Sequence, residues 1–290
     1  MISTCTICRI SGSYFNPGGI YMSISYDFHL HSDFSCDSDT PTEAMIERAL
    51  SLGLTGICFT EHQDLDGPLC SAGFHVDFPA YFEKLETLRA KYRGRIRIGI
   101  GLEFGIQPQL AGTLADLASE YPFDFIIASQ HFADGMDPYY PEFFEGRSER
   151  SAYESFFREQ LSSLQCTDCF DTLGHLDYVV RYGPNRNRYY SYEAYAELID
   201  PILQLLIERG KCLELNTGGL KYGLGEPNPC TAVLKRYREL GGELITIGSD
   251  AHAPQHIAFD FPVAQELLIS AGFRYYTVFE ARTPKQIRLI

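Results

Sequence analysis

Histidines and carboxylates recur in short groups along the chain, each at the end of a run of apolar residues. The first group, D-F-H-L-H, places His29 and His31 two residues apart, and on an extended segment such side chains project to the same side. Imidazole and carboxylate are ligands that Zn²⁺, Fe²⁺ and Mn²⁺ accept in proteins. The full set with this placement is His29, His31, Asp37, His62, Glu103, His131, His175, Asp250 and His252.

These nine side chains are too many for one ion, so the pattern predicts a centre of two or three divalent metal ions, Zn, Fe or Mn. A purely structural origin is a poor alternative, because buried histidines lose solvation free energy unless each is paired. His75 and His256 fall outside the pattern, and we interpret both as ordinary surface or loop residues. Glu61 and Asp177 stand next to predicted ligands and either orient imidazoles or lie at the surface.

The apolar runs before these residues predict β-strands, and most are continuous, which is typical of strands covered on both faces. We expect strands at 25–28, 54–59, 96–102, 123–128, 172–174, 212–215 and 244–247, with an eighth candidate at 275–279. Helical patterns, most with helix start or stop residues at their ends, cover 42–52, 80–92, 114–120, 151–164, 192–209 and 231–240. This alternation predicts an α/β barrel of parallel strands, whose carboxyl ends share one face.

The composition is that of an ordinary globular protein, with 45% hydrophobic and 21% charged residues among 290. The formal net charge of −14 opposes binding of long nucleic acids, which relies on clustered Lys and Arg. No apolar run reaches the length of a membrane span and no secretory signal is evident, so we expect a cytoplasmic protein without a membrane partner. The sequence does not indicate the oligomeric state.

We expect one barrel domain over residues 25–290 and an N-terminal extension of uncertain role over residues 1–24. One hypothesis is that the natural protein starts at Met22. The nine cysteines include the C-x-x-C pairs Cys5/Cys8 and Cys166/Cys169. These pairs lie too far apart in the sequence for a zinc ribbon, so we expect free thiols in a reducing compartment.

Four motifs resemble those of the polymerase and histidinol phosphatase (PHP) family: H-L-H-S-D-F-S-C-D at 29–37, T-E-H at 60–62, Glu103 with S-Q-H at 129–131, and S-D-A-H at 249–252. The resemblance spans residues 25–260 and implies a distorted (β/α)7 TIM-like barrel of PHP type with a trinuclear metal centre. The ligand groups that it implies are His29, His31, Glu103 and Asp250 for the first metal, Glu103, His131 and His175 for the second, and Asp37, His62 and His252 for the third.

Within the family, residues 141–153, 174–182 and 214–220 resemble the histidinol-phosphatase branch. The resemblance therefore implies hydrolysis of a small phosphate monoester, L-histidinol phosphate, to L-histidinol and phosphate in histidine biosynthesis. Adjacent metal ions suit this reaction, because they activate a bridging water, neutralise the phosphoryl oxygens and stabilise the leaving oxygen. Many relatives carry arginine where this chain has Lys221.

The planar fork of an arginine matches two phosphate oxygens, which makes Arg181, six residues after His175, the first candidate for a phosphate contact. Arg147 is a weaker candidate, and for both residues the alternative is an ordinary surface arginine. The predicted substrate contacts are Arg181, Arg147 and Lys221, and the predicted catalytic residues are Asp250, His252 and Arg181.

The residues leave three other functions open. A PHP enzyme that acts on nucleotides or short nucleic acid would share the metal ligands and differ only in its substrate pocket. Metal-dependent amide or ring hydrolases on related barrels commonly add a strand-end lysine, and this chain has none at these positions. A non-catalytic PHP scaffold usually lacks some ligands and would bind no metal, whereas every expected ligand position is filled here.

Overall fold

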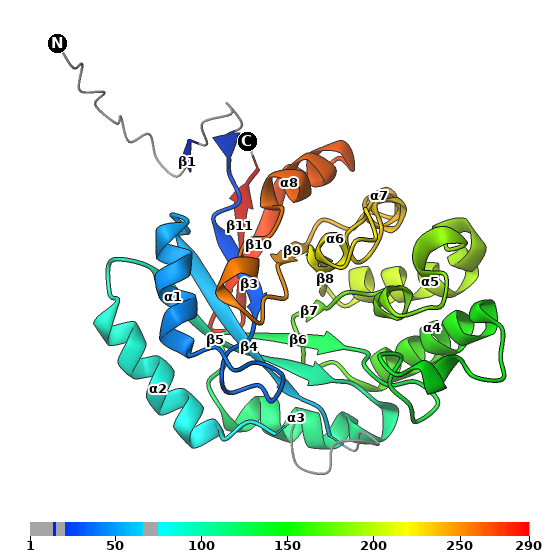
Figure 1. Ribbon diagram of the computed structural model, residues 1–290, viewed down its shortest axis with the longest axis horizontal. Coiled ribbons are helices and arrows are strands. Elements are labelled where there is room, and N and C mark those ends of the chain that lie inside the picture. Colours follow the sequence, from blue (N-terminus) through cyan, green and yellow to red (C-terminus); the bar gives the residue numbers. More distant parts are fainter. Residues whose placement is uncertain (1–13, 16–20, 66–74, 290) are drawn as a thin grey trace.

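Seven parallel strands form the centre of the molecule. The computed structural model describes residues 14–15, 21–65 and 75–289. Within this part the seven strands pair in sequence order, each with the next along the chain (Figure 1). They are β3 (Tyr26–Leu30), β4 (Gly56–Gln63), β5 (Arg97–Gly105), β6 (Phe125–Ser129), β7 (Thr172–Leu173), β8 (Cys212–Asn216) and β9 (Ile245–Gly248).

The first and last strands of this sheet approach each other and nearly close it into a barrel. The backbone N–H of Asp250 donates to the carbonyl oxygen of His29 at 2.8 Å, and the N–H of His31 donates to that of Ala251 at 2.8 Å. Both hydrogen bonds lie at the carboxyl ends of the strands. The predicted seven-stranded TIM-like barrel is therefore confirmed.

Helices surround the strands on the outside (Figure 1). Asp77 caps the second helix by accepting from the N–H of Ala80, and Ser148 caps the fourth by accepting from the N–H of Ser151. The α-helices are α1 (Thr42–Ser51), α2 (Phe78–Lys91), α3 (Ala111–Glu120), α4 (Glu149–Cys166), α5 (Tyr192–Glu208), α6 (Gly218–Lys221), α7 (Thr231–Glu239) and α8 (Phe261–Ser270). The 3₁₀ turns are η1 (Pro108–Leu110), η2 (Pro141–Phe144), η3 (Tyr178–Arg181), η4 (Arg186–Arg188) and η5 (Pro254–His256).

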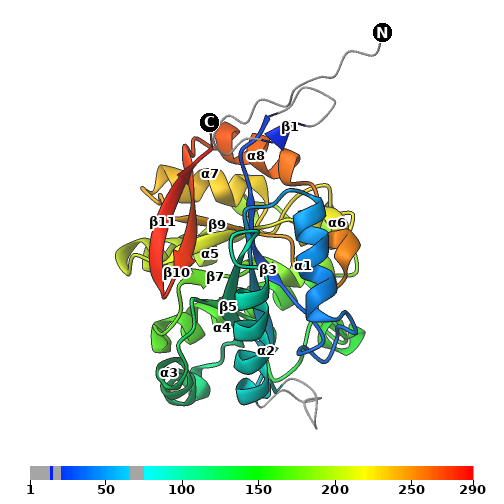
Figure 2. The same cartoon turned by 90° about the vertical axis from the view of Figure 1, so that its left-hand side faces the viewer.

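The eighth predicted strand exists but does not join the barrel. It is β10 (Tyr275–Glu280), which pairs antiparallel with β11 (Thr283–Arg288), a strand that the sequence did not predict. Figure 2 shows this hairpin on the side of the molecule away from α6. The N–H groups of Ala281 and Arg282, in the hairpin turn, donate to Asp124 just before β6. The hairpin thus covers the end of the barrel where the strands begin.

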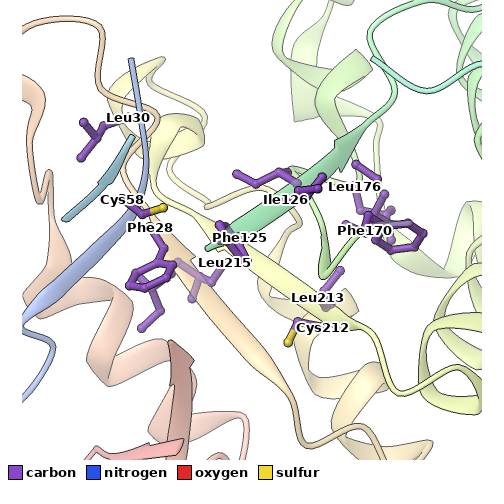
Figure 3. Close-up of a cluster of buried hydrophobic side chains, with 14 of the residues drawn as sticks. Phe28, Leu30, Cys58, Phe125, Ile126, Phe170, Leu176, Cys212, Leu213 and Leu215 are labelled. Carbon is purple, nitrogen blue, oxygen red and sulfur yellow. The ribbon is translucent and has the colours of Figure 1, made fainter. Parts of the chain in front are cut away.

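The core consists of apolar side chains from the strands and the helices around them (Figure 3). Phe28 and Phe125 meet edge to face with ring centroids 5.2 Å apart, and Phe279 of β10 packs on Phe125 at 5.0 Å. Every residue of β4, β6, β8 and β9 is buried. This explains the continuous apolar runs, because these strands are covered on both faces.

Most of the predicted extension over residues 1–24 lies outside the described residues, as do Cys5 and Cys8. Two short strands, β1 (Tyr14–Phe15) and β2 (Tyr21–Met22), pair antiparallel within it. Cys166 and Cys169 are free thiols, as predicted. In the part of the chain that the structure describes, no helix combines the length and apolar character needed to cross a bilayer.

Candidate metal centre and active site

The predicted ligands gather at the carboxyl ends of the barrel strands. His29, His62 and Glu103 lie within the last residues of β3, β4 and β5, and the pairing of β3 with β4 is irregular between Asp27 and Leu30. Such irregularities redirect side chains and are common beside active sites. The other six ligands lie on segments that follow strands, namely Asp37, His131, His175, Asp250 and His252 together with His31.

Four side chains form a first ligand group. Glu103 Oε2 lies 3.2 Å from His29 Nε2 and 3.5 Å from His31 Nε2. Asp250 Oδ1 completes the group, at 3.8 Å and 3.6 Å from the same two nitrogens. Ligands at about 2.0–2.2 Å from a tetrahedral ion lie roughly 3.3–3.6 Å from one another. The spacing of this group therefore suits a single bound cation.

The second oxygen of Glu103 faces a second group. Oε1 lies 3.0 Å from His175 Nε2 and 3.4 Å from His131 Nε2, and it accepts a hydrogen bond from Ser129 Oγ at 2.6 Å. Glu103 is fully buried and turns one oxygen toward each group. This geometry suits a carboxylate that bridges two metal ions.

A third group lies nearer to solvent. Asp37 Oδ2 lies 3.1 Å from His252 Nε2 and 3.5 Å from His62 Nε2. His62 also links this group to the others, because its Nδ1 lies 2.9 Å from Glu103 Oε2. The structure thus brings all nine predicted ligands together at one site, and His29, His31, His62 and Glu103 each lie close enough to contribute to more than one group.

Buried polar atoms in these groups are consistent with a bound cation. His29 Nε2, His31 Nε2 and Glu103 Oε2 are buried, and among the described residues they have no hydrogen bond of suitable geometry. Buried polar atoms without a partner are rare in native proteins because each loses solvation free energy. Imidazole nitrogens and carboxylate oxygens are also the donors that divalent Zn, Fe and Mn accept. The residues present therefore fit the predicted metal ions.

The electrostatics of the site favour positive charge. Burial disfavours a protonated imidazole at His29, yet the carboxylates of Glu214, Glu103 and Asp250 outweigh burial and raise the pKa of His29 well above its usual value. Burial is likewise outweighed at His62, where Glu103 and Asp37 raise the pKa to about 9. Carboxylates that retain protons on imidazoles also stabilise metal cations that replace those protons.

Two carboxylates that the sequence analysis missed hold the far nitrogens of ligand imidazoles. Glu214 Oε1 lies 2.7 Å from His29 Nδ1, and its Oε2 accepts from the backbone N–H of His175 at 2.8 Å. Asp64 Oδ1 lies 2.9 Å from His131 Nδ1. Such contacts fix the orientation of a ligand imidazole. Two features of the sequence could have indicated these residues. Glu214 is the only acid in the predicted apolar strand 212–215, and Asp64 lies two residues after the predicted ligand His62.

Glu61 and Asp177 are both buried. The Glu61 carboxylate accepts from Ser35 Oγ, which lies 3.2 Å from His31 Nδ1. The Asp177 carboxylate accepts from Asn228 Nδ2 at 2.6 Å. Glu61 therefore acts on a ligand through a serine, and Asp177 fixes an amide that belongs to the surroundings of Arg181.

Arg181 is a buried residue of the site rather than a surface arginine, with 4% of its surface exposed. Its Nη1 donates to Asp250 Oδ2 at 2.8 Å, its Nη2 to Asn216 Oδ1 at 2.9 Å and its Nε to Asn228 Oδ1 at 2.7 Å. These bonds use three of its five N–H donors and leave one hydrogen on each terminal nitrogen. Arg181 also lines the cavity beside the ligands.

The other predicted substrate contacts differ in their positions. Lys221 lines the same cavity, and its Nζ donates to the carbonyl oxygen of Asp250 at 2.7 Å. Arg147 is not brought to the cavity. Its Nη1 donates to Asp134 Oδ2 at 2.5 Å, and its guanidinium lies 4.0 Å from the ring centroid of Phe143. This position does not support a contact between Arg147 and the substrate, because Asp134 and Phe143 hold the side chain outside the cavity.

The two histidines outside the pattern also differ. His75 is an exposed residue, as predicted, and lies 3.5 Å from Gln63. His256, interpreted as an ordinary surface or loop residue, lies on η5 and is partly buried, and its side chain lines the cavity near Lys221 and His252. It does not directly follow a strand, so the strand-end rule could not identify it.

The ligand groups open into a cavity of about 570 Å³. It is lined by ligand side chains, by Arg181 and Lys221, and by several aromatic rings. The aromatic lining residues are Phe132, Tyr139, Tyr140, Tyr178, Tyr182 and Tyr222. A cavity of this size accommodates a small ligand, and its polar groups converge on one end.

Comparisons with known proteins identify related chains. A histidinol-phosphatase from Lactococcus lactis is 32% identical over 254 residues, which cover 87% of this chain and 93% of the relative. A protein from Clostridium acetobutylicum named "Probable histidinol-phosphatase" is 31% identical, covering 90% of this chain and 98% of the relative. The crystal structure of histidinol phosphate phosphatase from Lactococcus lactis, complexed with zinc, L-histidinol and phosphate, superposes with a TM-score of 0.84 at 31% identity, covering 90% of this chain and 99% of that one.

The family itself is identified by its model. The model of the PHP domain matches residues 27–218, about two thirds of the chain. This match includes seven of the nine predicted ligands, and the remaining two, Asp250 and His252, complete the first and third groups in space. The chain therefore belongs to the PHP domain family.

Proposed function

We propose that this protein is a metal-dependent phosphatase that hydrolyses L-histidinol phosphate to L-histidinol and phosphate. One observation carries the proposal: three groups of ligand side chains share Glu103 and His62 as links and open into one cavity beside Arg181. The relative whose crystal structure contains zinc, L-histidinol and phosphate supports the choice of substrate.

The nine ligands would hold two or three divalent ions in the groups described above. When bound, these ions would supply an activated water, neutralise the phosphoryl oxygens and stabilise the leaving oxygen. Glu103 would keep the first and second ions adjacent through its two oxygens. Glu214 and Asp64 would hold the His29 and His131 rings in place, so that little reorganisation is needed during the reaction.

Arg181 and Lys221 would bind the phosphoryl group from the side of Asp250. Burial disfavours the charged form of Arg181, but the adjacent Asp250 carboxylate outweighs this and raises its pKa, so the guanidinium stays charged. Its two remaining terminal hydrogens would bind phosphoryl oxygens, an arrangement typical of arginine. Asp250 and His252 would take part in catalysis because each would lie beside the ions and also lines the cavity.

The finer biological setting follows from this substrate. Hydrolysis of L-histidinol phosphate would place the protein in histidine biosynthesis, in the cytoplasm, with a small phosphorylated metabolite as its partner. The net charge of −14 favours such a metabolite over long nucleic acid.

The test is phosphate release from L-histidinol phosphate, a nucleoside monophosphate and a short DNA oligomer, with the metal content measured on the same sample. We expect turnover of L-histidinol phosphate at a kcat/KM at least about 100-fold above the other two substrates. Turnover confined to the nucleotide or the oligomer would overturn the substrate assignment. Metal-free protein without any turnover would favour a scaffold.

A further inference from the structure

The cavity wall formed by the loop after β6 carries a carboxylate that the proposed chemistry does not use. Asp137 lines the cavity and is partly buried. Its Oδ1 accepts from the backbone N–H of Tyr139 at 2.8 Å, which fixes the carboxylate in place. Among residues 21–65 and 75–289, no lysine or arginine forms an ion pair with it. Asp137 therefore offers a negative charge to the cavity rather than to the protein.

The charged side chains of the cavity come from different segments of the chain. The cationic side chains, Arg181 and Lys221, both bind Asp250. Asp137 lies on the loop after β6, where burial raises its pKa while the N–H of Tyr139 and the nearby His131 act in the opposite direction. A ligand that carries both an anion and a cation matches these opposite charges.

A row of tyrosine rings connects the loop of Asp137 with the segment of Lys221. Tyr182 packs against Tyr139 with ring centroids 5.3 Å apart, and against Tyr222 at 6.1 Å. Tyr139 belongs to the loop of Asp137, and Tyr222 follows Lys221 directly. Burial raises the pKa of both Tyr182 and Tyr222, so these rings remain neutral. Neutral aromatic faces bind a flat ring or an adjacent cation.

We propose that Asp137 is a specificity residue that binds the ammonium group of the leaving alcohol. The site would thus prefer phosphate esters of amino alcohols to esters of uncharged alcohols, and the tyrosine row would cover the part of the alcohol between phosphate and ammonium. This inference rests on the proposed function and extends it to a residue of the substrate pocket. A carboxylate in the cavity also repels nucleotides, which offer it no cation, and such repulsion is a common source of specificity.

The test compares two substrates that differ only in the amine. L-histidinol phosphate and 3-(imidazol-4-yl)propyl phosphate share the imidazole and the ester, and at pH 8 the imidazole of each is neutral, because its pKa is about 6.5. In the Asp137→Asn variant, kcat/KM for L-histidinol phosphate should fall by about 10- to 100-fold. For the amine-free ester it should change by less than about twofold, which also shows that the variant is folded.

Asp134→Asn is the matched control. Asp134 belongs to the same loop, but its carboxylate accepts from Arg147 and Ser155 instead of facing the cavity. We expect this variant to keep the wild-type preference for the amine. Equal loss on both substrates in Asp137→Asn, or no loss on either, would overturn the inference while leaving the proposed function intact. Wild-type protein that hydrolyses only the amine-free ester or nucleotides would overturn both.

Discussion

Asp250 interacts both with ligand imidazoles and with the two cationic side chains of the cavity. Its Oδ1 faces the imidazoles of His29 and His31, its Oδ2 accepts from Arg181, and its carbonyl oxygen accepts from Lys221. Its φ of 54° lies in the left-handed region, which few residues other than glycine adopt and which is often found at functional sites. The same residue thus connects the predicted metal ligands to Arg181 and Lys221, the side chains proposed to bind phosphate.

Arg181 provides a test at the scale of single residues. Replacement by alanine removes two free N–H donors from the cavity and leaves Asp250 Oδ2 without its partner. We expect kcat/KM for L-histidinol phosphate to fall, and the fall should correspond to a loss of about 2–4 kcal/mol in transition-state stabilisation. Steady-state kinetics measure this loss, with circular dichroism to verify folding.

Arg147→Ala is the control for this experiment, because Arg147 pairs with Asp134 outside the cavity. Its kcat/KM should stay within about twofold of wild type. An unchanged kcat/KM in Arg181→Ala, or equal losses in the two variants, would show that Arg181 does not bind the phosphoryl group.

At the scale of elements, the sequence predicts the seven barrel strands well because buried parallel strands are continuous apolar runs. Their ends are less well predicted. β4 extends to Gln63 and β5 to Gly105, beyond the predicted 54–59 and 96–102, since the polar residues of the site end the apolar pattern before the strand itself ends. Hydropathy thus places the ligands just past the strands, whereas three of them belong to the strands.

Other elements gave weaker signals in the sequence. The strand β11 was missed because five of its six residues are polar or proline and nearly all are exposed. The helix α8 was missed although it begins with a Phe-Pro pair, a plausible helix start. Glu214 and Asp64 were missed although each had a weak local signal, whereas His256 and Asp137 were missed because their positions depend on distances across the barrel, which no local spacing encodes.

Gly248 tests the packing of the barrel strands around the site. A Cβ at this position would overlap with the His29 side chain and lie 2.6 Å from Glu214 Oε1. Because both neighbours are buried, we expect Gly248→Ala to lower the free energy of unfolding by about 1–3 kcal/mol and to weaken metal binding. Thermal unfolding and metal titration measure the two effects.

Gly112→Ala is the matched control, since Gly112 is exposed on α3 and a Cβ there would meet no atom within 4 Å. Its melting temperature should be unchanged or slightly higher, because alanine favours helices. If Gly248→Ala behaved like this control, β9 and β3 would not be as closely packed at the site as the structure describes.

At the scale of the whole molecule, the metal centre joins the two edges of the barrel. His29 and His31 come from β3 and its end, whereas Asp250 and His252 follow β9, the last strand of the sheet. Among the described residues, few backbone hydrogen bonds join these two edges, and they lie at the carboxyl ends of the strands. Bound cations would therefore hold the barrel closed where its own strand pairing is sparse.

Chelation should consequently destabilise the entire fold. An ion that binds the native chain, at a free concentration about 100 times its Kd, contributes about 2.7 kcal/mol to the stability of the fold. We expect treatment with a strong chelator to lower the melting temperature by several degrees, and Zn²⁺ or Mn²⁺ to restore it. Equal melting curves before and after verified removal of the metal would show that the site does not hold the barrel together.

The central claim is that nine distant side chains bind a multinuclear metal centre, and the number of bound ions tests it most directly. Protein is equilibrated with Zn²⁺ and then freed of excess metal. Elemental mass spectrometry should find two or three ions per chain in this protein, as the ligand groups predict. The His131→Ala variant, which removes one ligand of the second group, should hold about one ion fewer and lose turnover. A wild-type chain with one ion or none that still hydrolyses the substrate would contradict the account.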